Sequence, residues 1–180
     1  MPLYAQLLGV HIISMVVGMG AVLVVDTFGL LWLMRRVELA FVMRVAEVTQ
    51  KLIWLGWTGS VVSGTALLLQ KGYVDELTMI KIALVAALGL NGIALHMLKG
   101  ALSRVRGNDV PLRLQMRIAL TTMVSQVGWW GAIIIGWLHS HVSHEINYPS
   151  HPIVVITVAC SVILVLLICE RFVVRYTSKS

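Results

Sequence analysis

The residues of this sequence that could do chemistry are histidines, one lysine and one aspartate placed inside long apolar segments. His11 and Asp26 fall within the first apolar run, and Lys81 and His96 fall within the third. An ionisable side chain is costly to place in a bilayer, so each is a candidate functional residue. Fifteen residues separate the members of each pair. That spacing is about 22 Å of helix and brings each pair roughly onto one helix face.

Two polar layers follow if the first and third helices are neighbours. His11 and Lys81 would form an outer layer, and Asp26 and His96 an inner layer. We expect Asp26 and His96 to approach each other, because a carboxylate in hydrocarbon needs a partner. The alternative is that Lys81 extends to the lipid headgroups and that His96 lies at the inner interface.

A second cluster of possible ligands follows the fourth apolar run. Four of the six histidines fall within 13 residues, next to Glu145. They are His139, His141, His144 and His151. Imidazoles with a carboxylate can bind zinc or copper, and the His11, Met15, Met19 spacing could line a path for copper(I). Solvated loop histidines and a methionine-filled apolar stripe are the alternatives.

The elements that must position these residues are membrane-spanning helices. The sequence is 58% hydrophobic and only 12% charged. These are too few charged residues to cover the surface of a water-soluble protein. The apolar runs are continuous and long enough for a bilayer core of ~30 Å, so they predict helices rather than a barrel. We expect one all-α domain, 1–180, that is an integral membrane bundle of five transmembrane helices at about 3–34, 52–70, 78–98, 118–138 and 153–170. The longest connections are expected at 35–51, a short amphipathic continuation, and at 99–117.

The basic residues predict the orientation of this bundle. Twelve of the 14 Lys and Arg residues fall on one side, leaving only Lys71 and Lys81 on the other. The positive-inside rule then puts the N-terminus outside and the C-terminus in the cytoplasm. The net charge of +6 is thus a topology signal, and the expected partner is the lipid bilayer rather than nucleic acid.

A ridge of small residues marks the second apolar run. Gly56, Ser60 and Gly64 recur every four residues and would let another helix approach closely. The ridge predicts either a homo-oligomer contact or packing within the bundle.

Several short motifs carry a resemblance to a known family. The segment 8–13 with His11, followed by Gly18 and Gly20, resembles the first helix of small bacterial membrane proteins related to the heme-containing protoporphyrinogen oxidase and copper-resistance D families. The segments 63–65, 81–85 and 91–96 are similar to the later motifs of proteins near those families, so the likeness covers about the first hundred residues. It implies that His11 ligates a b-type heme and that Lys81 lies near the substrate. Gly18 and Asp26 depart from the oxidase pattern, so the resemblance favours heme binding over oxidase activity.

The function expected first is therefore a membrane b-type heme protein with a redox, sensing or tetrapyrrole-related role in the bacterial cytoplasmic (inner) membrane. A second ligand must come from another helix at similar depth, which favours His139, then His141. Lys81 would meet a carboxylate of the heme or of a tetrapyrrole. The alternatives are a copper- or zinc-handling membrane protein that uses the histidine-rich loop, and a non-catalytic membrane subunit.

Overall fold

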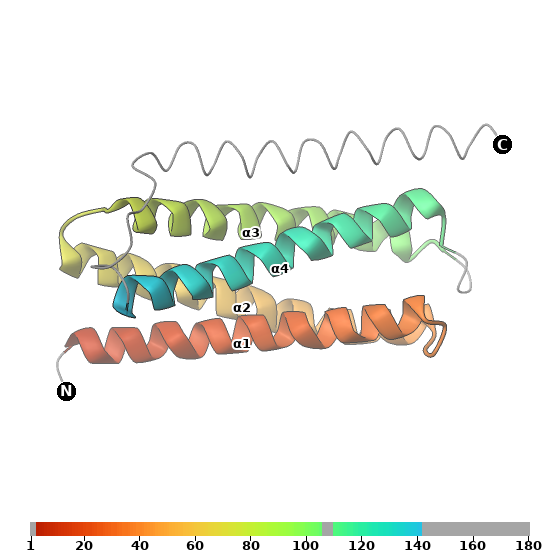
Figure 1. Ribbon diagram of the computed structural model, residues 1–180. Coiled ribbons are helices and arrows are strands. Elements are labelled where there is room, and N and C mark those ends of the chain that lie inside the picture. Colours follow the sequence, from red (N-terminus) through yellow and green to blue (C-terminus); the bar gives the residue numbers. More distant parts are fainter. Residues whose placement is uncertain (1–2, 106–109, 142–180) are drawn as a thin grey trace. The chain divides into compact units, whose positions relative to one another are not determined.

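The computed structural model describes residues 3–105 and 110–141 of the chain (Figure 1). These residues form four helices and no strand: α1 (Leu3–Leu33), α2 (Leu39–Lys71), α3 (Glu76–Leu102) and α4 (Leu112–His141). Each of the four is long and apolar enough to cross a membrane. The prediction of an all-α membrane protein is confirmed for this part of the chain. The fifth predicted helix, 153–170, lies outside the described residues.

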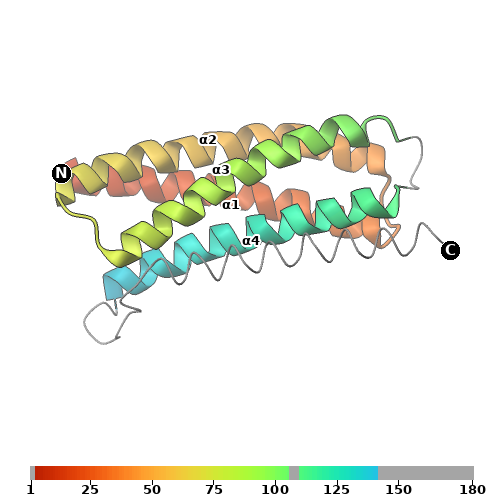
Figure 2. The ribbon, with the colours of Figure 1, turned by 90° about the horizontal axis from the view of Figure 1, so that it is seen from above.

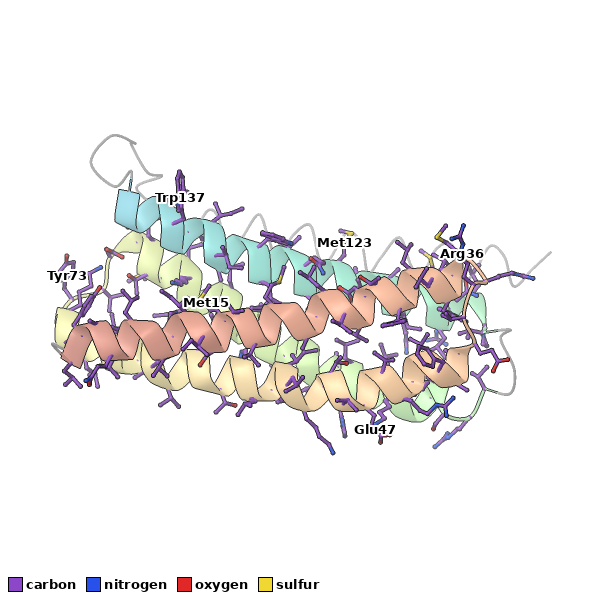
Figure 3. All side chains as sticks on the ribbon, turned by 90° about the horizontal axis from the view of Figure 1, so that it is seen from below. Met15, Arg36, Glu47, Tyr73, Met123 and Trp137 are labelled. Atoms are coloured by element: carbon purple, nitrogen blue, oxygen red, sulfur yellow. The ribbon has the colours of Figure 1, made fainter. Side chains whose placement is uncertain are left out.

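The four helices pair as two antiparallel hairpins, α1 with α2 and α3 with α4 (Figures 1 and 2). The chain divides between them into two compact units, Met1–Val74 and Asp75–Ser180. We describe each hairpin by itself. In the first hairpin, Arg36 lies at the turn and Tyr73 lies at the opposite end (Figure 3).

The turn of the first hairpin begins with a C-terminal cap that contains no glycine. The Arg35 N–H donates to the Trp32 carbonyl and the Arg36 N–H to the Leu31 carbonyl, both at 2.8 Å. This is the bonding pattern of a Schellman cap, with Arg35 in the left-handed region at φ 57°. Glycine usually fills that position, because only glycine adopts the conformation without strain. The helix end is therefore close to the predicted residue 34, although no glycine marks it.

The second helix is longer than its apolar run. We expected a span at 52–70 and a separate continuation at 35–51, but α2 is one helix of 33 residues, about 50 Å long at ~1.5 Å per residue. Its first part packs on α1 through buried Leu39 and Val42, while Arg44 and Lys51 are exposed. The apolar run measures the bilayer core, whereas the helix continues as long as it has an apolar stripe to bury.

The second hairpin also extends beyond the predicted spans of 78–98 and 118–138. Asp75 caps α3, because its carboxylate accepts a hydrogen bond of 2.8 Å from the Thr78 N–H. At the other end α4 starts directly after Pro111, a residue suited to the first turn of a helix. The connection expected at 99–117 is thus shorter than predicted, because both helices continue into it.

Candidate functional site

Small residues bring the two helices of the first hairpin close together along a seam that ends at His11. A Cβ added to Gly56 would lie 2.5 Å from the Gly18 Cα, and one added to Gly59 would collide with the Ser14 side chain. The helices therefore touch backbone to backbone at Gly56, and at Gly59 the α2 backbone meets the Ser14 side chain. On α1, His11, Ser14 and Gly18 are spaced three and four residues apart, which places them on one face.

The small-residue ridge predicted on α2 is part of this seam. Gly56 and Gly64 face α1, and Ser60 is buried. The ridge therefore packs within the hairpin, which is the second of the two interpretations given above. A homo-oligomer stays a prediction.

His11 lies at the end of this seam nearest the N-terminus, held by a hydrogen bond across the hairpin. Its Nδ1 is 3.0 Å from the Ser63 Oγ. The Ser63 hydroxyl is also 2.5 Å from the Gly59 carbonyl oxygen, one helical turn earlier. Ser63 is only 3% exposed, whereas His11 is half-buried, so the bridge as a whole is partly buried. A neutral imidazole fixed through one nitrogen is the usual arrangement of a metal-ligating histidine.

Gly64 provides the room that the His11 ring occupies. A Cβ at Gly64 would lie 3.2 Å from the His11 Cε1 and 3.5 Å from its Nδ1. The first of these contacts is tighter than most real Cβ contacts, so a larger residue at this position would press on the ring. His11, Ser63 and Gly64 thus form one constellation, which we call the His11 site.

Lys81 lies in the second hairpin, against a glycine of α4. Its Nζ is 3.1 Å from the position that a Cβ on Gly136 would occupy, and the side chain is half-buried. The part of the chain that the structure describes offers its ammonium no hydrogen-bond acceptor. Gly136 thus lets the Lys81 ammonium lie close to the α4 backbone.

The remaining contacts of the second hairpin are structural. Gly128 and Gly131 of α4 face Leu88 and Leu84 of α3. Buried Asn91 donates a hydrogen bond of 2.8 Å to the Thr121 carbonyl.

The predicted polar layers join residues of different hairpins, so they stay predictions. Asp26, on α1, is half-buried, and His96, on α3, is exposed. The predicted pair of His11 and Lys81 also joins residues of different hairpins, so it stays a prediction as well.

The predicted histidine cluster falls largely beyond the described residues. His139 and His141 lie in the last turn of α4, where the helix but not the side chains is described, and His144 and His151 lie outside the described residues. Within residues 3–105 and 110–141, no three His, Cys, Asp or Glu side chains gather as a metal site would require.

Sequence reasoning identified His11 but missed its partner. Ser63 falls seven residues after Gly56 and four after Gly59, so it shares their helix face. The signal was available as a small polar residue on the same face as a glycine ridge.

Models of known protein families, curated proteins and solved structures were compared with this chain, and none of them matches it.

Proposed function

We propose that this chain is a membrane b-type heme protein in which His11 ligates the iron through Nε2. One observation carries the proposal: Ser63 binds the Nδ1 of an intramembrane histidine, at 3.0 Å, in a seam lined by glycines. Heme-ligating histidines are held in this way, with one nitrogen engaged by the protein and the other directed to the metal. Bound there, the heme would supply one-electron redox chemistry, ligand sensing or tetrapyrrole chemistry.

The residues present fit such a group. His11 is a nitrogen donor in a largely apolar helix, and the missing Cβ of Gly64 gives its ring room. A neutral donor in apolar surroundings suits b-type heme, whose iron accepts histidine as an axial ligand. The chain's own residues orient the donor: Ser63 fixes the ring, and Gly59 fixes Ser63.

Residues of the second hairpin are proposed as further ligands from the sequence. His139, with His141 as the substitute, is proposed as the residue that would supply a second ligand. Lys81 is proposed to bind a propionate or a substrate carboxylate, because its ammonium lies close to the α4 backbone at Gly136 and the described residues give it no acceptor. A charge-assisted hydrogen bond to a carboxylate would be strong in such surroundings. If the protein is an enzyme, Lys81 is its candidate catalytic residue in a membrane oxidoreductase reaction.

An optical spectrum of the purified protein tests the proposal. We expect a Soret band in the wild-type protein and its loss in His11→Ala. The same substitution at His144 is the control, and it should leave the band intact. Retention of the full Soret band in His11→Ala would contradict the proposal.

Two glycine-to-alanine variants test the same proposal while His11 stays in place. Gly64→Ala should lower the heme content, because its Cβ would push on the His11 ring. Gly20→Ala on α1 should not, since a Cβ there meets nothing within 4 Å. Equal heme content in the two variants would show that the His11 ring is not what holds the heme.

The second candidate function is copper or zinc handling, which the residues following His11 on α1 favour. Met15 is half-buried one turn after His11, and Met19 is buried one turn further. Thioethers and imidazole suit copper(I), and the loop residues His139, His141, His144 and His151 would add nitrogen donors. Stoichiometric metal without a Soret band would favour this function, and its loss in His144→Ala would assign it to the loop. If neither heme nor metal is found, the non-catalytic subunit becomes the better interpretation.

We also propose a membrane topology and location for the chain. The twelve-to-two division of basic residues supports five spans with the N-terminus outside and the C-terminus in the cytoplasm. The resemblance to small bacterial membrane proteins supports the cytoplasmic (inner) membrane of a bacterium.

A further inference from the structure

We infer that Ser63 is a positioning residue that fixes His11 in the Nδ1–H tautomer and thereby places the ring's lone pair on Nε2. The inference deepens the proposed function and depends on it only for the identity of the metal group that Nε2 would bind.

The argument starts from the single hydrogen of the Ser63 hydroxyl. The Oγ lies 2.5 Å from the Gly59 carbonyl oxygen, a separation that two oxygens reach only with a hydrogen between them. A carbonyl oxygen is an acceptor and brings no hydrogen of its own. The hydrogen in this bond is therefore that of Ser63, and Ser63 donates to Gly59.

The hydrogen between Ser63 and His11 must then come from the ring. The only hydrogen of the Ser63 hydroxyl is already donated to Gly59. In the 3.0 Å contact with Nδ1, the Ser63 Oγ can therefore act only as an acceptor. His11 consequently donates from Nδ1–H. In a neutral imidazole, the lone pair is then on Nε2, which is the form that coordinates a metal.

The bridge also sets how strongly the ring donates electrons. The hydroxyl that gives its hydrogen to a carbonyl becomes a better acceptor, because successive hydrogen bonds polarise one another. A stronger acceptor polarises the Nδ1–H bond, leaves more electron density on the ring and so raises the basicity of Nε2. Removing it should weaken the ligand and favour the reduced form of a bound iron.

The position of Ser63 makes this arrangement rigid. Its side chain is 3% exposed and is tied to its own helix one turn away. Gly59, which supplies the carbonyl, is itself in close contact with Ser14 of α1. The orientation of the ring is therefore set by the packing of the hairpin.

Nitrogen NMR of metal-free protein with ¹⁵N-labelled histidine tests the inference directly. His11→Ala identifies the His11 signals by their loss. We expect a protonated Nδ1 and an unprotonated Nε2 in the wild-type protein. In Ser63→Ala we expect a shift toward the Nε2–H tautomer that histidine prefers in water.

Ser60→Ala is the matched control. Ser60 lies three residues earlier on α2 and is also buried, at 8% exposure, but its Oγ makes no hydrogen bond within the described residues. Its removal should leave the His11 tautomer unchanged. Nε2–H in the wild-type protein would overturn the inference without any variant, as would an unchanged tautomer in Ser63→Ala.

A heme readout separates this inference from the proposed function. In heme-loaded protein, Ser63→Ala should raise the midpoint potential while Ser60→Ala should not. A wild-type Nδ1–H tautomer without any Soret band would refute heme binding and leave the role of Ser63 standing. A Soret band that depends on His11, combined with Nε2–H in metal-free protein, would refute the role of Ser63 alone.

Discussion

At the scale of single residues, the packing of the first hairpin depends on glycines, whose lack of a side chain lets the two helices approach closely. Where α2 crosses α1, Gly56 faces the Gly18 backbone and the Ser14 carbonyl, and no flexible side chain is present to move aside. Small residues of this kind drive helix association in membranes through close packing, because lipid and leucine are equally apolar.

A glycine-to-alanine pair tests this packing. Gly56→Ala should destabilise the protein by about 1–3 kcal/mol, since its Cβ would lie 2.5 Å from backbone atoms of Gly18. Gly20→Ala should be neutral or stabilising by up to about 1 kcal/mol, because its Cβ meets nothing and alanine favours the helix. Unfolding in mixed detergent measures both. Equal stabilities would show that α1 and α2 are not in backbone contact at Gly56.

His11 could be predicted from the sequence, but Ser63 could not. A histidine in an apolar run is expensive whatever surrounds it, so its type alone marks it. A serine in a membrane helix is ordinary, because it can bond to the carbonyl one turn back, as Thr49 and Thr65 also do. What distinguishes Ser63 is its register against His11, and that register depends on how Gly56 and Gly59 dock on α1.

At the scale of elements, hydropathy predicted the existence and type of the four helices but not their ends. The predicted span at 52–70 matches the apolar part of α2, whereas the helix begins at Leu39. A bilayer limits the length of an apolar run, but a helix ends where the backbone caps it. Asp75 is of a residue type that often caps helices, whereas Arg35 is not, since arginine rarely adopts φ 57°.

The pairing of α3 with α4 rests partly on one polar contact that can be removed. Asn91→Ala should destabilise the protein by roughly 0.5–1.5 kcal/mol, because it deletes the 2.8 Å hydrogen bond to the Thr121 carbonyl. Unfolding in mixed detergent gives the value. Thr65→Ala is the control, as Thr65 is exposed and bonds only within its own helix. Its effect should stay within about 0.5 kcal/mol. A similar loss in both variants would mean that the Asn91 bond does not hold the hairpin.

At the scale of the whole molecule, the distribution of charge rather than packing decides how the chain sits in a bilayer. Arg35 and Arg36 lie in the turn of the first hairpin, and Arg104 follows α3 in the second. Lys71 lies at the opposite end of the first hairpin, where it contacts the Tyr73 ring at 4.5 Å. The same charge pattern was readable from the sequence, because it requires only the order of the spans. The mutual placement of the two hairpins depends on which faces pack, and hydropathy does not encode that.

Membrane-impermeant maleimide labelling of single-cysteine variants in intact cells tests the topology. Cys160 and Cys169 are first replaced with Ala, so that the introduced cysteine is the only thiol. Ser140→Cys, in the last turn of α4, should react from the outside. Ser103→Cys, the cap of α3, should react only after the cells are opened, because that connection carries the basic residues that remain in the cytoplasm.

The same experiment also counts the spans. Ser178→Cys lies beyond the fifth apolar run, so it should behave like Ser103→Cys if 153–170 crosses the membrane and like Ser140→Cys if it does not. Protection at Ser140 together with labelling at Ser103 would invert the whole topology. His11, at the start of α1, and His139, near the end of α4, would then lie in the cytoplasmic half of the membrane. The prediction that they lie at similar depth would be unaffected, since it follows from the direction of the spans and not from the side on which the chain begins. The heme proposal thus survives an inverted topology, while the assignment of its site to the outer half does not.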